Sequence, residues 1–178
     1  MKKIPILSLV LLILFSSAQA QTVPTVTGSL VSQQEAQEAL DFHNKVRKDV
    51  KVAPLTWSTD LSVYAQAWAD NLASTGCKMQ HRPHSGEWAQ QYGENIYWAM
   101  GGQLQPVNAS SSWYSEIKYY KHGPLSNSNL MKVGHYTQMV WQDSKQVGMG
   151  KATCKNGSVI IVANYDPRGN MFGKKVYE

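Results

Sequence analysis

The chain is expected to fold as one α+β domain, in which helices come first and an antiparallel hairpin comes last. Apolar residues recur at helical spacing in the first half of the 178 residues. Residues 145–153 and 159–164 are two strand candidates, and Asn156-Gly157 between them is a strong signal for a hairpin turn. Helices followed by a hairpin are typical of helix layers packed on an antiparallel sheet.

The first 20 residues have the pattern of a secretory signal peptide. Lys2 and Lys3 form a basic head, residues 4–15 are apolar, and Ala18-Gln19-Ala20 is a cleavage pattern. A membrane anchor is the alternative, but it needs about 20 apolar residues, and no other segment is long and apolar enough to span a membrane. We therefore expect cleavage after Ala20 and a secreted or periplasmic protein.

The charge balance is mildly basic. After residue 20 the chain holds 15 basic and 12 acidic side chains, and the basic ones are scattered along the sequence. This pattern does not favour nucleic acid as a partner. The length favours a single domain with a substantial buried core.

Two cysteines, Cys77 and Cys154, remain in the exported chain. An exported protein meets an oxidising compartment, so a disulfide between them is the natural interpretation. The alternative is a pair of buried free thiols. A bridge across so long a loop would stabilise the fold by about 4 kcal/mol through chain entropy.

The elements follow in order after the leader. Residues 21–31 are rich in Thr, Val and Pro and are expected to form a flexible N-terminal segment. The domain proper, residues 32–178, opens with a helix because Ser32-Gln33-Gln34-Glu35 is a capping box. A second helix is expected from near Ser58 until Gly76, which is a plausible stop.

The middle of the chain is less regular. Residues 78–92 are polar and are expected to form a loop, and residues 93–98 a short strand. Residues 109–120 suggest a third helix. A stretch rich in Gly, Pro, Ser and Asn covers residues 123–129.

Seven polar residues are candidates for chemistry. Histidines and carboxylates are the usual ligands of a metal or the partners of an acid/base pair. Taken singly, each is more typical of a hydrogen-bonded structural residue or a solvated face. The seven are His43, His81, His84, His122, His135, Glu94 and Glu116.

Six motifs in the chain resemble those of the CAP superfamily, which comprises cysteine-rich secretory proteins, antigen 5 and plant pathogenesis-related class 1 proteins. They occur in family order over nearly the whole chain after the leader. The resemblance implies an α-β-α sandwich with a central antiparallel sheet. The motifs are His43-Asn44-x-x-Arg47, Cys77-x-x-x-His81, Gly93-Glu94-Asn95-Ile96, Trp113-Tyr114-Ser115-Glu116, residues 134–141 and residues 161–170.

The resemblance also implies a site, because the family places two histidines and two glutamates around a large surface cleft. Carried over, the histidines are His81 and His135, as ligands of zinc or another divalent metal, and the acids are Glu94 and Glu116, as candidate catalytic groups. Neutral imidazoles are good zinc ligands, and two of them leave coordination positions open. His84 is the alternative to His81, but His81 keeps the three-residue gap from Cys77.

The resemblance further assigns the cysteines. Plant members carry three disulfides, and the Cys77–Cys154 pair corresponds to one of them. Met149 and Ala163 stand where both halves of a second bridge would be, and we expect them to pack as apolar core. A third bridge, in the loop before His135, is also missing as a pair.

Three functions are open at this point. The favoured one is a secreted binding protein that takes a small amphipathic ligand, such as a sterol or a fatty acid, with a divalent metal in the same cleft. The second is a metal-assisted hydrolase of esters or peptides, which is less favoured because the sequence marks no nucleophile. The third is an extracellular protein-interaction role with a vestigial cleft.

Overall fold

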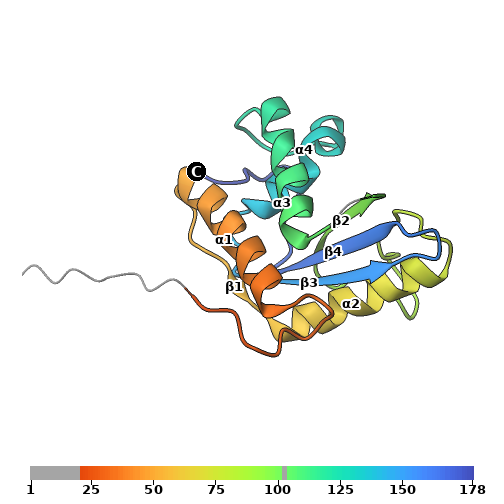
Figure 1. Cartoon of the computed structure of the whole chain (residues 1–178). Coiled ribbons are helices and arrows are strands. Elements are labelled where there is room, and N and C mark those ends of the chain that lie inside the picture. The colour runs from red at the N-terminus through yellow and green to blue at the C-terminus, as the bar shows by residue number, and fades with distance from the viewer. Residues whose placement is uncertain (1–20, 102–103) are drawn as a thin grey trace, which may run out of the picture.

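A four-stranded sheet forms the middle layer of the molecule (Figure 1). The computed structural model describes residues 21–101 and 104–178, so the signal peptide predicted for residues 1–20 lies outside the described residues. The strand order is β1 (Thr56–Trp57), β3 (Gln146–Thr153), β4 (Val159–Asp166) and β2 (Gly93–Ala99).

The three long strands, β3, β4 and β2, pair antiparallel, which confirms the predicted sheet and hairpin. The two-residue strand β1 pairs parallel with β3 and was not predicted. Strand β2 lies at one edge of the sheet, with β4 as its only strand partner among the described residues. One side of β2 is therefore open to other parts of the chain.

Helices cover both faces of the sheet, as Figure 1 shows, so the expected α-β-α sandwich is confirmed. Helix α2 (Thr59–Ser74) covers one face, and helices α1 (Gln33–Asp49), α3 (Pro106–Tyr114) and α4 (Asn127–Met139) lie on the other. Because β-strand side chains alternate between faces, β4 supplies both cores: Ile160 and Val162 pack toward α2, while Ile161, Ala163 and Tyr165 pack toward α1, α3 and α4.

Helix α2 lies unusually close to strand β3. A Cβ atom at Gly148 or Gly150 would overlap the backbone of α2 at Ser62 or Gln66. Glycine is therefore required at both positions for this approach.

Helix α1 begins as predicted. The Ser32 hydroxyl accepts from the Glu35 N–H at 3.3 Å, and the Glu35 carboxylate accepts from the Ser32 N–H at 2.9 Å. Two orphan donors of the first turn are thereby satisfied. Helix α2 likewise begins after Ser58, whose hydroxyl accepts from the Leu61 N–H at 3.2 Å.

The third predicted helix, residues 109–120, is two elements in the structure. Helix α3 ends at Tyr114, and a 3₁₀ helix, η1 (Ser115–Tyr119), follows. At the junction the Ser115 hydroxyl donates to the Ser112 carbonyl at 2.7 Å, a local bond that competes with α-helical geometry. Pro106 occupies the first helical position, where its missing N–H costs nothing.

Helix α4 was not predicted. The Gly/Pro/Ser/Asn composition of residues 123–129 indicated only irregular chain, but the helix starts inside that stretch. The Asn129 side chain accepts from the Ser126 N–H at 2.9 Å and so supports the first turn. This helix carries His135.

The segment 21–31, expected to be flexible, packs against the domain. It has no helix or strand, but Val23 and Val31 are buried in the core. The Val23 N–H donates to the Gln37 side chain at 2.8 Å, and the Trp57 indole donates to the Thr27 carbonyl at 3.2 Å. Buried valines and hydrogen bonds to α1 and β1 therefore hold this segment against the domain, although its composition is that of a loop.

The predicted disulfide is present. Cys77 and Cys154 are bonded, with their Cα atoms 5.9 Å apart, and the bridge joins the segment after α2 to the end of β3. Met149 and Ala163 lie directly opposite each other on β3 and β4 and are fully buried. Apolar packing therefore occupies the place where relatives were expected to carry a second bridge.

Candidate functional site

Two histidine–glutamate pairs form the candidate site. In the first, His81 Nδ1 lies 2.8 Å from Glu94 Oε1. The Glu94 side chain is fully buried, whereas that of His81 is 55% exposed. An ionised carboxylate only accepts, so the Nδ1–H of His81 donates to it and the Nε2 lone pair is left available.

Glu94 is held in turn by the residue that follows His81. The Arg82 backbone N–H donates to Glu94 Oε1 at 3.1 Å, and the Arg82 Nε atom lies 3.8 Å from Oε2. The Arg82 side chain is 4% exposed, and burial lowers its pKa from the usual value for arginine. The buried carboxylate thus faces a cation at close range.

Aromatic rings enclose the Arg82 guanidinium. It lies 3.7 Å from the centre of the Tyr64 ring and 5.1 Å from the ring centres of both Trp68 and Trp88. One of its nitrogens also donates to the Tyr64 carbonyl at 2.6 Å. Cation–π contacts of this kind strengthen when the cation is desolvated, so Arg82 fastens the loop of residues 78–92 to helix α2.

The second pair joins helix α4 to η1. His135 Nδ1 lies 2.6 Å from Glu116 Oε1. The other carboxylate oxygen accepts from the backbone N–H groups of His135 at 2.9 Å and Tyr136 at 3.1 Å. The imidazole also stacks on Trp113, with ring centres 6.3 Å apart and planes 15° apart. The chain changes from α3 to the 3₁₀ helix η1 at Ser115, directly before Glu116. This change of helix type fixes the backbone position from which the Glu116 side chain extends.

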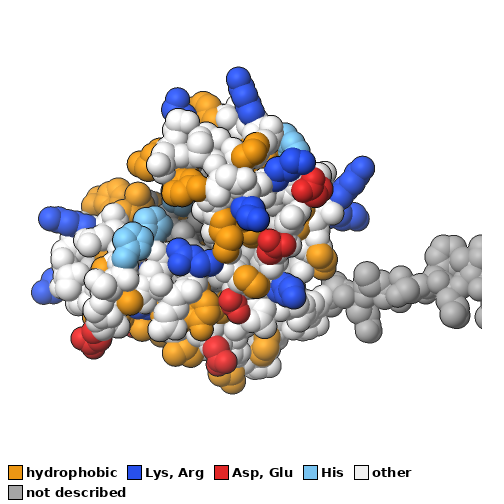
Figure 2. All heavy atoms as spheres, turned by 180° about the vertical axis from the view of Figure 1, so that it is seen from behind, with side chains coloured by type: hydrophobic (Ala, Val, Ile, Leu, Met, Phe, Trp, Pro, Cys, Tyr) orange, Lys and Arg blue, Asp and Glu red, His pale blue; other side chains and the backbone are white. Residues whose placement is uncertain are grey.

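Strand β2 connects the two pairs. Glu94 and its neighbour Asn95 point to opposite faces of the strand. Asn95 Nδ2 donates to the His135 carbonyl at 3.0 Å and contacts the Tyr165 hydroxyl at 3.3 Å. Consecutive residues of one edge strand therefore contact the two pairs. Figure 2 shows histidine side chains beside a hollow on one face of the molecule.

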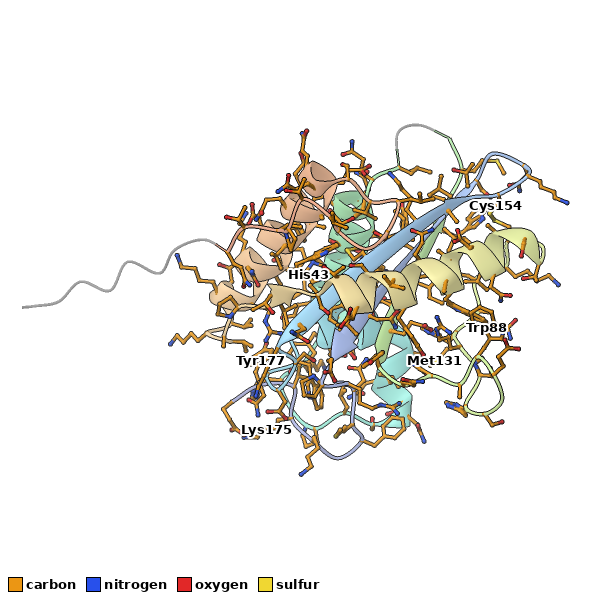
Figure 3. All side chains as sticks on the ribbon, turned by 90° about the horizontal axis from the view of Figure 1, so that it is seen from below. His43, Trp88, Met131, Cys154, Lys175 and Tyr177 are labelled. Atoms are coloured by element: carbon orange, nitrogen blue, oxygen red, sulfur yellow. A yellow bond between two sulfur atoms is a disulfide. The ribbon has the colours of Figure 1, made fainter. Side chains whose placement is uncertain are left out.

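A buried network supports the second pair from behind. The Tyr165 hydroxyl lies 2.9 Å from His43 Nε2, and His43 Nδ1 lies 2.8 Å from the Ala39 carbonyl. Burial lowers the pKa of His43 to about 4, so the ring is neutral: Nδ1–H donates to Ala39 and Nε2 accepts from Tyr165. His43, a candidate from sequence and labelled in Figure 3, is thus a structural residue under the site.

Arg47 holds the far end of helix α4. Its guanidinium donates to the carbonyls of Met139 at 3.0 Å, Trp141 at 2.9 Å and Ser144 at 2.8 Å. Burial lowers its pKa to about 10, and it remains charged at neutral pH. These bonds satisfy carbonyls at a helix C-terminus, where a cation is favoured. The first-helix motif of His43 and Arg47 therefore positions the element that carries His135.

The remaining candidates lie apart from the pairs. His84 is exposed, and it is His81 that contacts Glu94. His122 is exposed and bonds to the Tyr177 carbonyl at 2.9 Å. A surface hollow of about 610 Å³ beside residues 25–33, Gln66 and Asp70 contains none of the paired histidines or glutamates.

The donor set fits a divalent metal in part. Each carboxylate orients an imidazole through Nδ1, as outer carboxylates do for zinc-bound histidines. Within residues 21–101 and 104–178, however, no group of three or more His, Cys, Asp or Glu side chains lies close enough to hold a metal ion. Because Nδ1 of each ring faces a carboxylate, Nε2 is the atom that His81 and His135 could each offer to a metal.

Sequence reasoning missed three contributors to this site: Arg82, Asn95 and Trp113. Asn95 and Trp113 belong to motifs that were recognised, so their presence was visible but their roles were not. Arg82 carried no signal, because its partners Tyr64, Trp68 and Trp88 come from helix α2 and the far side of its own loop.

Comparison with known proteins agrees with this architecture. The profile of the cysteine-rich secretory protein family, CAP, matches residues 40–165. Pathogenesis-related protein 1C of Nicotiana tabacum is 40% identical over 152 residues, covering 85% of this chain and 86% of its own length. Pathogenesis-related protein 1 of Arabidopsis thaliana is 38% identical over 156 residues, covering 85% and 91%.

Solved structures share the fold. NaASP2, crystallised with Zn²⁺, superposes with a TM-score of 0.72 at 24% identity, over 83% of this chain and 87% of its own. BmVAL-1 superposes with a TM-score of 0.69 at 26% identity, over 85% of each chain. Motifs, fold, disulfide and similarity agree, and the chain therefore belongs to the cysteine-rich secretory protein, or CAP, family.

Proposed function

We propose that this chain is an extracellular binding protein that holds a divalent metal, zinc in the first instance, between His81 and His135. The observation that carries the proposal is the pairing itself. Nδ1 of His81 lies 2.8 Å from Glu94, and Nδ1 of His135 lies 2.6 Å from Glu116. Neither Nε2 atom has a hydrogen-bond partner among the described residues. A similar fold crystallised with Zn²⁺ adds support.

The chain's own residues would have distinct roles. Glu94 and Glu116 fix the tautomer and direction of His81 and His135. Arg82 and the α4 backbone hold the carboxylates. When bound, the metal would supply a localised positive charge with open coordination positions.

Those open positions suggest the class of the second ligand. A small amphipathic molecule with an oxygen-bearing head, such as a fatty acid or a sterol, could present that head to the metal. Its tail would then need an apolar surface beside the site. Such a ligand remains our proposal for the physiological partner.

Binding is favoured over hydrolysis by the state of the carboxylates. Glu94 is fully buried and accepts from both His81 and Arg82, so it has no direct route to a substrate water. Glu116 already accepts from His135 and Tyr136. A general base needs a lone pair within reach of the proton it abstracts. The Glu94 oxygen that accepts no hydrogen bond, Oε2, is buried beside Arg82.

Zinc titration of the metal-free secreted protein by calorimetry tests the proposal. We expect saturable binding of one ion, weakened about tenfold or more in His81→Ala and in His135→Ala. His84→Ala, three residues away in the same loop, is the matched control and should bind like the parent. Fatty-acid and sterol binding with and without zinc tests the second ligand. Failure to bind zinc saturably, or equal losses in His84→Ala, would overturn the metal proposal.

A further inference from the structure

The positive charge that is scattered along the sequence is concentrated at one end of the folded molecule. We define this lysine-rich end as residues 115–132 and 171–178. The two segments hold five lysines and two glutamates, whereas the rest of the chain after residue 20 holds ten basic and ten acidic side chains. The whole excess of positive charge therefore lies at this end.

The charges are available to solvent. All five lysine side chains are exposed. Of the two glutamates, Glu116 is bound to His135, and Glu178 contacts Lys175 at 2.8 Å. Acidic side chains therefore neutralise little of this surface. The lysines are Lys118, Lys121, Lys132, Lys174 and Lys175.

Hydrogen bonds join the two segments into one surface. The Leu125 N–H donates to the Lys174 carbonyl and the Gly173 N–H to the Leu125 carbonyl, each at 2.9 Å. His122 bonds to the Tyr177 carbonyl at 2.9 Å. Met131, Lys175 and Tyr177 lie on the same side of the molecule in Figure 3.

Large apolar side chains stand exposed among these lysines. Met131 is 89% exposed, Tyr119 59%, Phe172 56%, Met171 45% and Ile117 37%. Figure 2 shows lysine and hydrophobic side chains interspersed over this end of the molecule. Single exposed apolar residues are ordinary, but a group of them among exposed lysines marks an interaction surface.

We propose that the lysine-rich end docks on the surface of a membrane that contains anionic lipids. Lysine ammonium groups are attracted to anionic headgroups within about a Debye length. Met, Phe, Ile and Tyr side chains can then enter the headgroup–acyl boundary while the lysine stems remain at the interface. A soluble polyanion would use the lysines alone and leave the apolar side chains in water.

The proposal goes beyond metal binding and does not depend on it. The docking residues are not metal-ligand candidates, and docking requires no ion. Docking also differs from insertion: among the described residues no helix is long and apolar enough to cross a membrane.

Co-sedimentation with phosphatidylglycerol and phosphatidylcholine vesicles tests the docking. The sample is the secreted protein, with its N-terminus determined by mass spectrometry so that the apolar residues 4–15 are absent. At about 0.1 M salt, where the Debye length is about 10 Å, we expect binding to the anionic vesicles only. Replacing Lys121, Lys132 and Lys174 by Gln should weaken the partition coefficient about 100-fold, at roughly fivefold for each lysine.

A matched variant removes the same charge elsewhere. Lys45, Lys145 and Lys155 are exposed and lie outside the lysine-rich end, so their replacement by Gln should change binding by less than about threefold if position matters more than net charge. Met131→Ser with Phe172→Ser should weaken vesicle binding about tenfold and leave heparin binding unchanged.

Three results would overturn the proposal. The first is no binding of the parent protein to anionic vesicles. The second is equal loss in the two lysine variants, which would indicate attraction by net charge. The third is that the Met131→Ser, Phe172→Ser variant binds anionic vesicles as well as the parent protein does and also binds heparin. That result would indicate a site for a soluble polyanion. Circular dichroism of each variant establishes that it is folded.

Discussion

The two histidine–glutamate pairs have the same chemistry but are held by different kinds of structure. His81–Glu94 joins a long loop to an edge strand, and its geometry depends on Arg82 seated among rings of α2 and the loop. His135–Glu116 joins α4 to the adjacent η1, and backbone N–H groups of α4 itself hold the carboxylate. The buried Arg82 side chain therefore supports the first pair, whereas two backbone N–H groups of α4 support the second.

Because of this difference, the two pairs should respond to different perturbations. Loosening the loop of residues 78–92 should disturb the first pair and leave the second intact. A change in η1 should do the reverse. Changes in the shared core beneath β2 should affect both pairs.

The largest expected effect comes from the disulfide. Replacing Cys77 and Cys154 by Ala removes a disulfide between residues that are 77 positions apart in the sequence. This should lower the free energy of unfolding by about 4 kcal/mol. Because Cys77 lies four residues before His81, amide hydrogen exchange should quicken in the loop before it does in α4. Urea unfolding and site-resolved exchange measure both quantities. Uniform exchange across the two pairs would contradict the comparison.

Arg82→Met should be the next most damaging change. It removes the cation beside a buried carboxylate, which typically costs about 3 kcal/mol or more, while keeping an apolar stem among Tyr64, Trp68 and Trp88. Urea unfolding gives the loss, and the imidazole NMR signals of the two histidines should separate: those of His81 shift and those of His135 do not. Arg82→Lys is the conservative control and should recover part of the stability. Equal shifts at both histidines would show that Arg82 has no local role.

How far the sequence predicted this molecule depends on where each contact lies. The helix starts at Ser32 and Ser58, the hairpin at Asn156-Gly157 and the Cys77–Cys154 bridge follow from local patterns, and all are present. Helix α4 was missed because Asn and Ser at its start are more typical of turns. The structure shows that Ser126 and Asn129 cap the first turn and that Val133, Tyr136 and Met139 pack into the core.

The candidate site divides in the same way. The resemblance named the four paired residues, and the structure pairs His81 with Glu94 and His135 with Glu116. Sequence alone gave neither this partnering nor the enclosure of Arg82, because both depend on side chains brought together from separate elements. The prediction that the pairs share a metal stays untested until zinc is titrated.

The buried His43 predicts a pH dependence of the stability of the whole fold. Its pKa is about 4 in the folded protein against about 6.5 in the unfolded chain. Between these values the unfolded state binds a proton that the native state excludes, so stability falls as the pH is lowered from about 7 toward 4. The loss should reach about 2 kcal/mol at pH 5. Urea unfolding of the parent and of His43→Gln at a series of pH values measures the difference in slope, and parallel slopes would contradict the assignment.

Glu116→Gln should give the smallest change and the sharpest test of the second pair. The amide keeps one acceptor for the α4 N–H groups but loses the charge-assisted bond to His135, so unfolding should become easier by only about 1 kcal/mol. Zinc affinity should fall about tenfold, because the His135 imidazole loses the carboxylate that orients it. Glu94→Gln is the matched substitution in the other pair. It should cost more stability, since it leaves the buried Arg82 without its anion. If the two variants lose equal stability, the contrast between a carboxylate held by the buried Arg82 cation and one held by two backbone N–H groups is wrong.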